Sequence, residues 1–217
     1  MKAVGIIDYN LGNLFSVCQA CKEVGIQIVM CTEASDLSSL DAYILPGVGS
    51  FKEAMNNLRA SGMDAVLIEE VKKGKPLFGI CLGLQLLFDT SEEFGETEGL
   101  GILKGRVKKF PNRTPKGEKI RIPNIGWNSV EIQQSRIPGI TTPLIEISEN
   151  DYVYFIHSYY VETDNKECVL SKTKYESVNY ISSVQQGNIF ATQFHPEKSG
   201  EKGLSIYRNW AISNKLI

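Results

Sequence analysis

Short apolar segments alternate with amphipathic segments through the first part of the chain, and this alternation limits the fold more than any other feature. The predicted strands are Ala3–Asp8, Ile26–Cys31, Ala42–Leu45 and Leu77–Ile80. The predicted helices are Gly12–Val24, Ser50–Ala60, Met63–Lys73 and Leu82–Phe88. Strands with so few polar residues must be buried on both faces, so the alternation predicts a mostly parallel sheet flanked by helices.

After Gly101 the pattern changes, and strand-like segments dominate. These segments are Ile102–Phe110, Trp127–Ile132, Tyr152–Glu162, Val169–Tyr175, Asn179–Gln186 and Ile189–Phe194. Gly187-Asn188 predicts a hairpin turn between the last two, and a final helix is expected over about Lys202–Ser213. No linker rich in Pro, Gly or Ser separates the halves. We therefore expect residues 1–217 to form a single α/β domain with an antiparallel β-rich insertion in its second half.

The composition excludes several classes of protein. With 42% hydrophobic and 22% charged residues, the chain has the composition of a globular protein. A net charge of −2 provides no positive field, so no nucleic-acid partner is expected. The longest apolar stretch, Leu77–Phe88, is too short to span a membrane, and the N-terminus lacks the long apolar region of a signal peptide. We therefore expect a cytoplasmic protein with no membrane partner.

The five cysteines do not predict a disulfide framework, because their number is odd and their spacing is wide. Cys18 and Cys21 form a C-x-x-C pair, which in other contexts serves redox or zinc chemistry. There is no second pair, and both cysteines fit the apolar stripe of the predicted helix 12–24. We interpret them as core residues and expect no metal site.

The segment Gly79-Ile80-Cys81-Leu82-Gly83 joins a predicted strand to a predicted helix. This is the pattern of a nucleophile elbow with Cys in place of Ser. A thiol at the start of a helix lies where partial positive charge favours the thiolate. The alternative is that Cys81 is a small apolar residue filling a tight turn.

A cysteine nucleophile that releases an amine needs a proton donor, and the chain has two histidines, His157 and His195. Residues two apart on an extended segment point to the same side, so Glu197 can orient the His195 ring. A structural His-Pro-Glu loop is the alternative. Together with the elbow, however, this segment favours a catalytic triad of Cys81, His195 and Glu197.

Pro46-Gly47-Val48-Gly49 follows the predicted strand 42–45. Glycines there allow main-chain N–H groups to turn inward as donors to an oxyanion, and the N–H of Leu82 would be a second donor. The alternative is an ordinary turn. The chain contains neither a Walker-type phosphate loop nor G-x-G-x-x-G, so nucleotide binding is not indicated and no cofactor is expected.

The P-G-V-G, G-x-C-x-G and H-P-E motifs occur in an order that resembles the class I, triad-type glutamine amidotransferases. Within that class the chain is similar to the glutaminase subunits of imidazole glycerol phosphate synthase. The stretches that carry this narrower resemblance are Asp8–Asn13, Asn124–Asn128, Tyr154–Tyr159 and Phe194–Ser199. The resemblance implies a flavodoxin-like fold and hydrolysis of glutamine to glutamate and ammonia. It also implies an oxyanion hole near Val48, Gly49 and Leu82.

The resemblance further implies that Gln85 and Glu93 bind the head group of L-glutamine, while the backbone of Ser158 and Tyr159 closes over it. The alternatives are a polar residue at a helix start for Gln85 and a solvated acidic patch for Glu93. His157 is interpreted as a hydrogen-bonded structural residue near this site. The basic stretch 104–109 is interpreted as a solvated face.

The resemblance also implies a partner, a (β/α)₈-barrel synthase subunit that receives the ammonia in a heterodimer. That subunit forms imidazole glycerol phosphate and aminoimidazole carboxamide ribonucleotide in histidine biosynthesis. The expected interface residues are Asn10, Asn13, Trp127, Tyr154 and Lys198. Alternatively, Trp127 is a core residue and Lys198 a solvated one.

Two other functions stay open at this stage. A duplicated subunit of this type supplies ammonia to a sugar amidotransferase in surface-polysaccharide synthesis, and the triad residues do not distinguish that case. The other alternative is a non-catalytic α/β scaffold module that retains the elbow. If the histidine-pathway assignment is right, we expect the isolated subunit to be a weak glutaminase.

Overall fold

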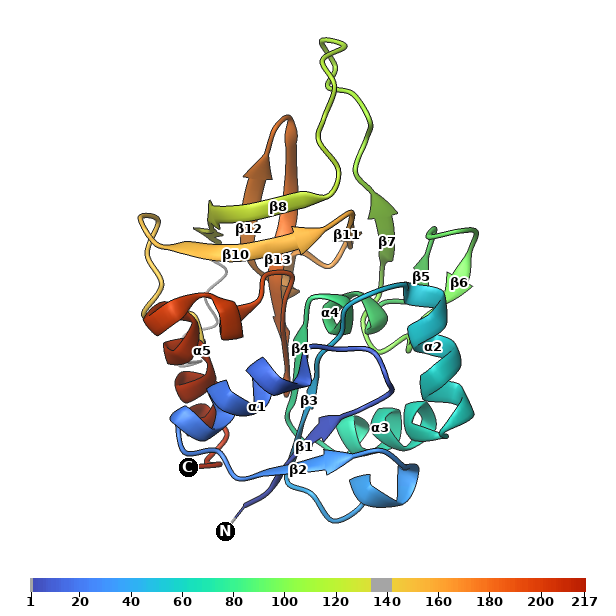
Figure 1. Ribbon diagram of the computed structural model, residues 1–217, viewed down its shortest axis with the longest axis vertical. Helices are drawn as coiled ribbons and strands as arrows, with labels where there is room; N and C mark the ends of the chain where they lie inside the picture. The colour runs from blue at the N-terminus through green and yellow to red at the C-terminus, as the bar shows by residue number, and fades with distance from the viewer. Residues whose placement is uncertain (1, 134–141) are drawn as a thin grey trace.

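The predicted parallel sheet is present in the structure, a computed structural model that describes residues 2–133 and 142–217 (Figure 1). Its parallel strands are β1 (Val4–Ile7), β2 (Ile28–Cys31), β3 (Ala42–Leu45), β4 (Leu77–Ile80) and β14 (Ile189–Thr192). They lie in the order β2-β1-β3-β4-β14. This order is the flavodoxin-like arrangement, in which ligands bind beyond the carboxyl ends of the strands.

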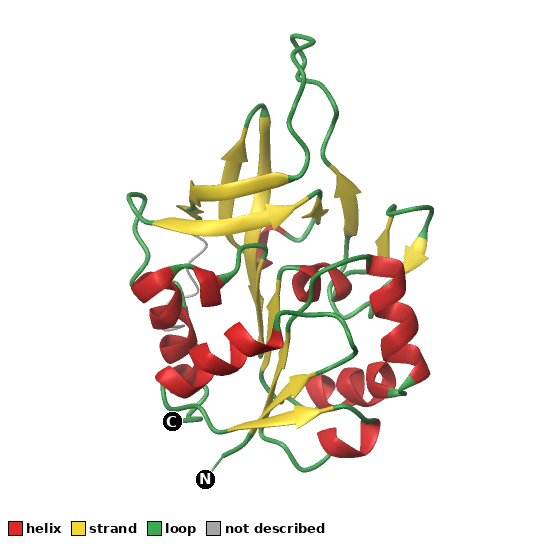
Figure 2. Cartoon of the chain, viewed as in Figure 1, coloured by secondary structure: helices red, strands yellow, loops and turns green. Residues whose placement is uncertain are grey.

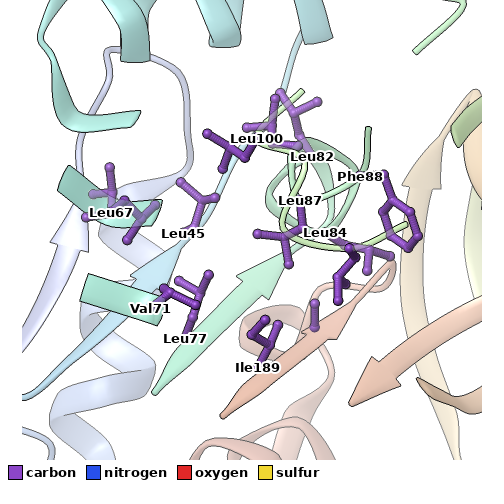
Figure 3. Packing of buried hydrophobic residues seen from close by; sticks show 14 of the residues in the cluster. Leu45, Leu67, Val71, Leu77, Leu82, Leu84, Leu87, Phe88, Leu100 and Ile189 are labelled. Atoms are coloured by element: carbon purple, nitrogen blue, oxygen red, sulfur yellow. The ribbon is translucent and has the colours of Figure 1, made fainter. Parts of the chain in front are cut away.

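Helices cover both faces of this sheet, as the alternation predicts (Figure 1). One face packs against α1 (Leu14–Glu23) and α5 (Gly200–Ser213), and the other against α2 (Phe51–Ala60) and α3 (Met63–Lys72). Figure 3 shows leucine side chains of α3, β3 and β4 meeting those of α4 (Leu82–Leu86) in the core on the α2–α3 face of the sheet. This packing holds α4, and so its first residues, against the sheet.

The ends of two helices follow from local hydrogen bonds. The Ser50 hydroxyl accepts from the Glu53 N–H at 3.3 Å, which confirms the predicted start of α2. Helix α1 begins later than predicted, because Asn13 caps it by accepting from the Ser16 N–H.

Cys21 of α1 is buried in the core and Cys18 is half-buried beside it, and burial raises the pKa of both thiols. This environment agrees with the interpretation of the pair as core residues.

The second half of the chain extends the same sheet with antiparallel strands (Figure 2). These strands are β7 (Arg106–Lys109), β9 (Glu131–Ile132), β11 (Tyr159–Glu162), β12 (Val169–Tyr175) and β13 (Val178–Gln186). Two short strands, β5 (Thr90–Ser91) and β6 (Thr97–Glu98), complete that edge. A separate antiparallel ribbon of β8 (Asn124–Ser129) and β10 (Tyr152–His157) lies across the upper end of the sheet in Figure 1.

Several predicted boundaries are wrong for physical reasons. The predicted strand 152–162 is two strands in different sheets, separated at Ser158. The predicted strand 102–110 is shortened to Arg106–Lys109, because Gly105 has φ +138°, outside the range of strand residues. The predicted strand segment 127–132 is divided between β8 and β9. Helix α4 ends at Leu86, two residues before the predicted end at Phe88.

The hairpin predicted at Gly187-Asn188 is confirmed, with Gly187 at φ +58°. The strand that follows it, β14, also pairs in parallel with β4. The chain therefore returns from the antiparallel region into the centre of the parallel sheet. No helix among residues 2–133 and 142–217 is both long and apolar enough to cross a membrane.

Candidate active site

Three neighbouring strands bring the predicted catalytic segments together at one edge of the sheet. Strand β3 leads into Pro46–Gly49, β4 leads into Cys81, and β14 leads towards His195. Because β3, β4 and β14 are adjacent and parallel, their carboxyl ends lie side by side. The resulting site occupies the position where flavodoxin-like folds bind their ligands.

Cys81 forms a strained turn between β4 and α4. Its φ is +56° and its ψ is −107°, a conformation that costs a non-glycine residue about 1–3 kcal/mol. A side chain at Gly83 would clash with the Leu45 carbonyl, and one at Gly79 would press against the Gly83 backbone. The two flanking glycines of the motif are therefore required by the close approach of the backbone. Cys81 is 6% exposed.

His195 and Glu197 form a buried pair beside Cys81. His195 Nδ1 lies 2.7 Å from Glu197 Oε1, and both side chains are almost fully buried. The other ring nitrogen, Nε2, is buried and has no hydrogen-bond partner among the described residues. Burial disfavours the charged ring, but the Cys81 and Glu197 side chains outweigh this effect and raise the pKa of His195 to about 10. This environment favours the protonated ring.

A pocket of about 270 Å³ opens above Cys81. Every residue predicted for the oxyanion hole or for substrate binding lines it. These residues are Val48, Gly49, Leu82, Gln85, Glu93, Ser158 and Tyr159. Pro123, Ile156 and His157 complete the wall. The volume suits a single amino acid.

The Pro46–Gly49 segment is held by two hydrogen bonds. The buried Tyr9 hydroxyl donates to the Pro46 carbonyl at 2.7 Å. The Leu82 N–H donates to the Gly47 carbonyl at 3.4 Å. One of the N–H groups predicted to hold an oxyanion is thus already bonded to the main chain in this conformation.

The two polar side chains predicted to bind substrate are both fixed in place. Glu93 Oε2 accepts from the Phe51 N–H at 2.6 Å, at the positive end of α2. Gln85 Nε2 donates to the Tyr159 carbonyl and to Gln193 Oε1, each at 3.0 Å. Glu93 is thus not simply part of a solvated acidic patch. Gln85 lies in α4 and is 6% exposed.

Gln193 is a site residue that the sequence analysis missed. It is fully buried, and its Nε2 lies 3.7 Å from Cys81 Sγ. It precedes His195 by two residues, so the alternation that pairs His195 with Glu197 also points Gln193 to their side. The two-residue spacing of Gln193 and His195 was therefore the signal in the sequence that could have identified Gln193.

His157 has the structural role that was predicted for it. Its Nδ1 donates to the Tyr159 carbonyl at 2.9 Å, which leaves Nε2 as an acceptor for Asn124 and Tyr180, each at 3.2 Å. Complete burial lowers the pKa of His157 to about 4. The ring is therefore neutral, and it supports the pocket wall.

Three of the five predicted interface residues form one cluster, which we call the Trp127 cluster: Trp127, Tyr154 and Lys198. Trp127 packs edge-on against Tyr154, with ring centroids 5.8 Å apart, and Lys198 Nζ lies 5.5 Å from the centre of the Tyr154 ring. Trp127 is 53% exposed, so it is not a core residue. Lys198 is also exposed, but its ammonium group lies over the Tyr154 ring. Asn10 and Asn13 lie on the loop before α1, with Asn10 exposed and at φ +65°.

The Trp127 cluster is joined to the catalytic segment by the backbone. The His195 N–H donates to the Tyr154 carbonyl at 2.8 Å, and the Tyr154 N–H donates to the Ser199 hydroxyl at 3.0 Å. Within the described part of the chain, no group of three or more His, Cys, Asp or Glu side chains gathers as metal ligands would.

Comparison with known proteins identifies the family. The family model for glutamine amidotransferase class-I matches residues 5–214. A protein of Geobacillus sp. (strain WCH70) named imidazole glycerol phosphate synthase subunit HisH is 46% identical over 208 residues, or 96% of this chain and 95% of that protein. This chain belongs to the HisH family of class I glutamine amidotransferases.

Other relatives agree with this assignment. The HisH protein of Bacillus subtilis (strain 168) is 41% identical over 203 residues, which cover 94% of this chain and 92% of that protein. A solved structure described as a glutamine amidotransferase has a TM-score of 0.72 at 21% identity and covers 98% of each chain. At that identity the likeness concerns the fold alone, and it supports the class I amidotransferase architecture of this HisH-family chain.

Proposed function

We propose that this HisH-family chain hydrolyses L-glutamine to glutamate and ammonia through a triad of Cys81, His195 and Glu197. The observation that carries the proposal is the juxtaposition of a strained Cys81 at the floor of an amino-acid-sized pocket with a buried His195 that is held through Nδ1 by Glu197. A structural turn would not require this combination of backbone strain and a buried His–Glu pair.

In the proposed reaction, the Cys81 thiolate attacks the side-chain amide carbon of glutamine. His195 then gives its proton to the departing nitrogen, so ammonia leaves and a γ-glutamyl thioester remains on Cys81. The neutral ring next takes a proton from water, and the resulting hydroxide cleaves the thioester to glutamate. Glu197 holds the ring through Nδ1 in every step, so Nε2 always faces the reacting atoms.

The oxyanion of each tetrahedral intermediate would be held by main-chain N–H groups of Val48 or Gly49 and Leu82. In the conformation described here, the Leu82 N–H is bonded to the Gly47 carbonyl. We propose that this bond breaks when the hole assembles. The isolated chain should then be a weak glutaminase, because it must pay for this rearrangement without help from a partner.

The substrate's α-ammonium group would lie near the acceptors of Glu93 and Gln85, and its other end near Cys81. Both acceptors are held by bonds to the protein, so little side-chain freedom is lost on binding. The backbone of Ser158 and Tyr159 forms the opposite wall. The pocket therefore has a polar end for the head group and a reactive end for the amide.

The proposed partner is a (β/α)₈-barrel synthase subunit that takes up the ammonia in a heterodimer and serves histidine biosynthesis. The support is the 41–46% identity to proteins named as subunits of imidazole glycerol phosphate synthase. The exposed Trp127 cluster offers an anchor, since Trp and Tyr are enriched in binding hot spots. Bound there, a partner would contact the segment that carries His195.

Covalent labelling tests the proposed nucleophile. A glutamine analogue with an electrophilic diazoketone in place of the amide should label Cys81, and an excess of L-glutamine should protect it, as measured by peptide mass spectrometry. The half-buried Cys18 serves as the internal control and should stay unlabelled. Labelling of Cys18 alone, or no protection by glutamine, would contradict the proposal.

A further inference from the structure

A chain of side-chain amides connects the pocket to the nucleophile. It runs from the Tyr159 carbonyl to Gln85 Nε2, then from the same Nε2 to Gln193 Oε1, each at 3.0 Å. From there Gln193 Nε2 reaches Cys81 Sγ at 3.7 Å, within hydrogen-bond range for sulfur. Gln85 and Gln193 are both buried, so their N–H groups depend on these partners and not on bulk water.

One backbone carbonyl sets the direction of both amides. The Tyr159 carbonyl can only accept, so the Gln85 atom facing it must be the NH₂ group. The second N–H of that group must then meet an acceptor, which requires Oε1 of Gln193. Gln193 Nε2 is therefore left facing Cys81, and it can only donate.

The same logic fixes what Gln85 offers to a ligand. Both of its N–H donors are used inside the protein. Its Oε1 is the group that remains, and Gln85 lines the pocket. Gln85 can therefore present an acceptor but no donor, which suits an ammonium group.

We propose that Gln193 is a positioning residue with two tasks: it keeps Gln85 turned so that an acceptor faces the substrate, and it donates an N–H to the Cys81 sulfur. This inference rests on the proposed function, because it gives Gln193 a role toward the nucleophile and the substrate-binding residue named there. Gln193 acts through Gln85 and Cys81 and does not itself contact the pocket's ligand.

Two substitutions separate the two tasks. Gln193→Glu has nearly the same shape and can still accept from Gln85, but its carboxylate gives Cys81 no donor. Gln193→Met removes both bonds. Gln186→Met is the matched control, because Gln186 is an exposed glutamine on β13 away from the pocket.

The first readout is the rate at which iodoacetamide alkylates Cys81 as a function of pH, followed on the Cys81 peptide by mass spectrometry. A donor to the sulfur favours the thiolate, so its loss should move the midpoint upward by about one pH unit in both Gln193 variants. Gln186→Met should leave the midpoint where it is in the wild type. The shift in Gln193→Met decides the question, because this variant adds no charge and a role in packing alone would not move its midpoint; the carboxylate of Gln193→Glu adds a shift of its own.

The second readout is KM for glutamine, measured in the complex with the barrel subunit. Gln193→Met should raise KM several-fold, because Gln85 is no longer held, whereas Gln193→Glu should change it much less. An unchanged alkylation midpoint in folded Gln193→Met protein would overturn the inference, and so would equal KM values for the two variants.

Separate measurements test the role of Gln193 and the proposed glutaminase activity. Alkylation needs no turnover, so its pH midpoint reports on Gln193 even if the chain does not hydrolyse glutamine. Loss of glutamate release in Cys81→Ala tests the nucleophile independently of Gln193. Should Gln193→Met fail to fold, Gln193→Leu, which likewise has no donor and adds no charge, tests the donor to Cys81.

Discussion

The two histidines have opposite electrostatic environments although both are buried. Burial lowers the pKa of His157 to about 4, whereas the Cys81 and Glu197 side chains overcome burial and raise the pKa of His195 to about 10. We therefore expect neither ring to titrate between pH 6 and 8, which is unusual for histidine. Because the chain has two histidines, NMR of ¹³C-histidine-labelled protein can follow both.

In the same experiment Cys81→Ala should lower the pKa of His195, because the partner that favours its proton is gone. His157 serves as the internal reference and should stay neutral in both proteins. A ring that titrates near 6.5 in the wild type would show that the buried His195 pair is not charged as described.

His157 also predicts a pH dependence of stability. Its folded pKa lies below its unfolded value of about 6.5, so unfolding takes up a proton at acidic pH. The stabilisation is fully present above pH 6.5 and is lost as the pH falls toward 4, by at most about 3 kcal/mol. Urea unfolding from pH 4 to 7 measures it. The slope over this range should be smaller in His157→Gln, and an equal slope would contradict the assignment.

The residues that motifs predict are those whose roles depend on near neighbours in the chain. Cys81 needs its two flanking glycines, and Glu197 needs His195 two positions before it. The hydrogen bonds of Gln193 depend instead on Gln85, which lies 108 positions away. Such pairing follows from the fold, so the sequence offered only the two-residue spacing as a hint.

In the proposed assembly of the oxyanion hole, the Pro46–Gly49 segment is the element that moves. Tyr9 holds it by donating to the Pro46 carbonyl and packs so closely that a side chain on Gly47 would clash with its hydroxyl. Tyr9→Phe removes a bond of about 1 kcal/mol, equivalent to about fivefold in a conformational population. We expect glutamate release by the isolated chain to rise by about that factor.

Tyr43→Phe is the matched control for this prediction. Its buried hydroxyl also donates to a backbone carbonyl, that of Leu37, and Tyr43 does not line the pocket. It should destabilise the fold without raising activity. Equal or lower activity of Tyr9→Phe relative to wild type would show that the Tyr9 bond does not restrain the segment.

The parallel half was predictable element by element, because each strand is a short apolar run followed by a helix with its own end signals. Strands β3 and β4 match their predicted bounds, and Ser50 caps α2 as expected. The antiparallel half was predicted less well. The division of 152–162 between two sheets has no local signal, since Ser158 sits between strands whose partners come from distant segments.

For the whole molecule, the Trp127 cluster connects a surface to the catalytic edge of the sheet. We expect Trp127→Ala to weaken binding of the barrel subunit by about thirtyfold, the effect of losing a hot-spot residue of about 2 kcal/mol. Calorimetric titration measures this loss. Ile212→Ala, at an exposed apolar residue of α5, is the control and should bind normally. Unchanged affinity of Trp127→Ala would place the interface elsewhere.

We propose that this chain is a glutaminase whose activity depends on a barrel-shaped synthase subunit. The most direct test of this proposal is glutamate release from L-glutamine by the purified chain, alone and with that subunit and its nucleotide ligand. We expect slow glutamate release by the chain alone, strong stimulation in the complex, and no release from a folded Cys81→Ser variant that still binds the subunit. Turnover by Cys81→Ser, or equal rates with and without the partner, would contradict it.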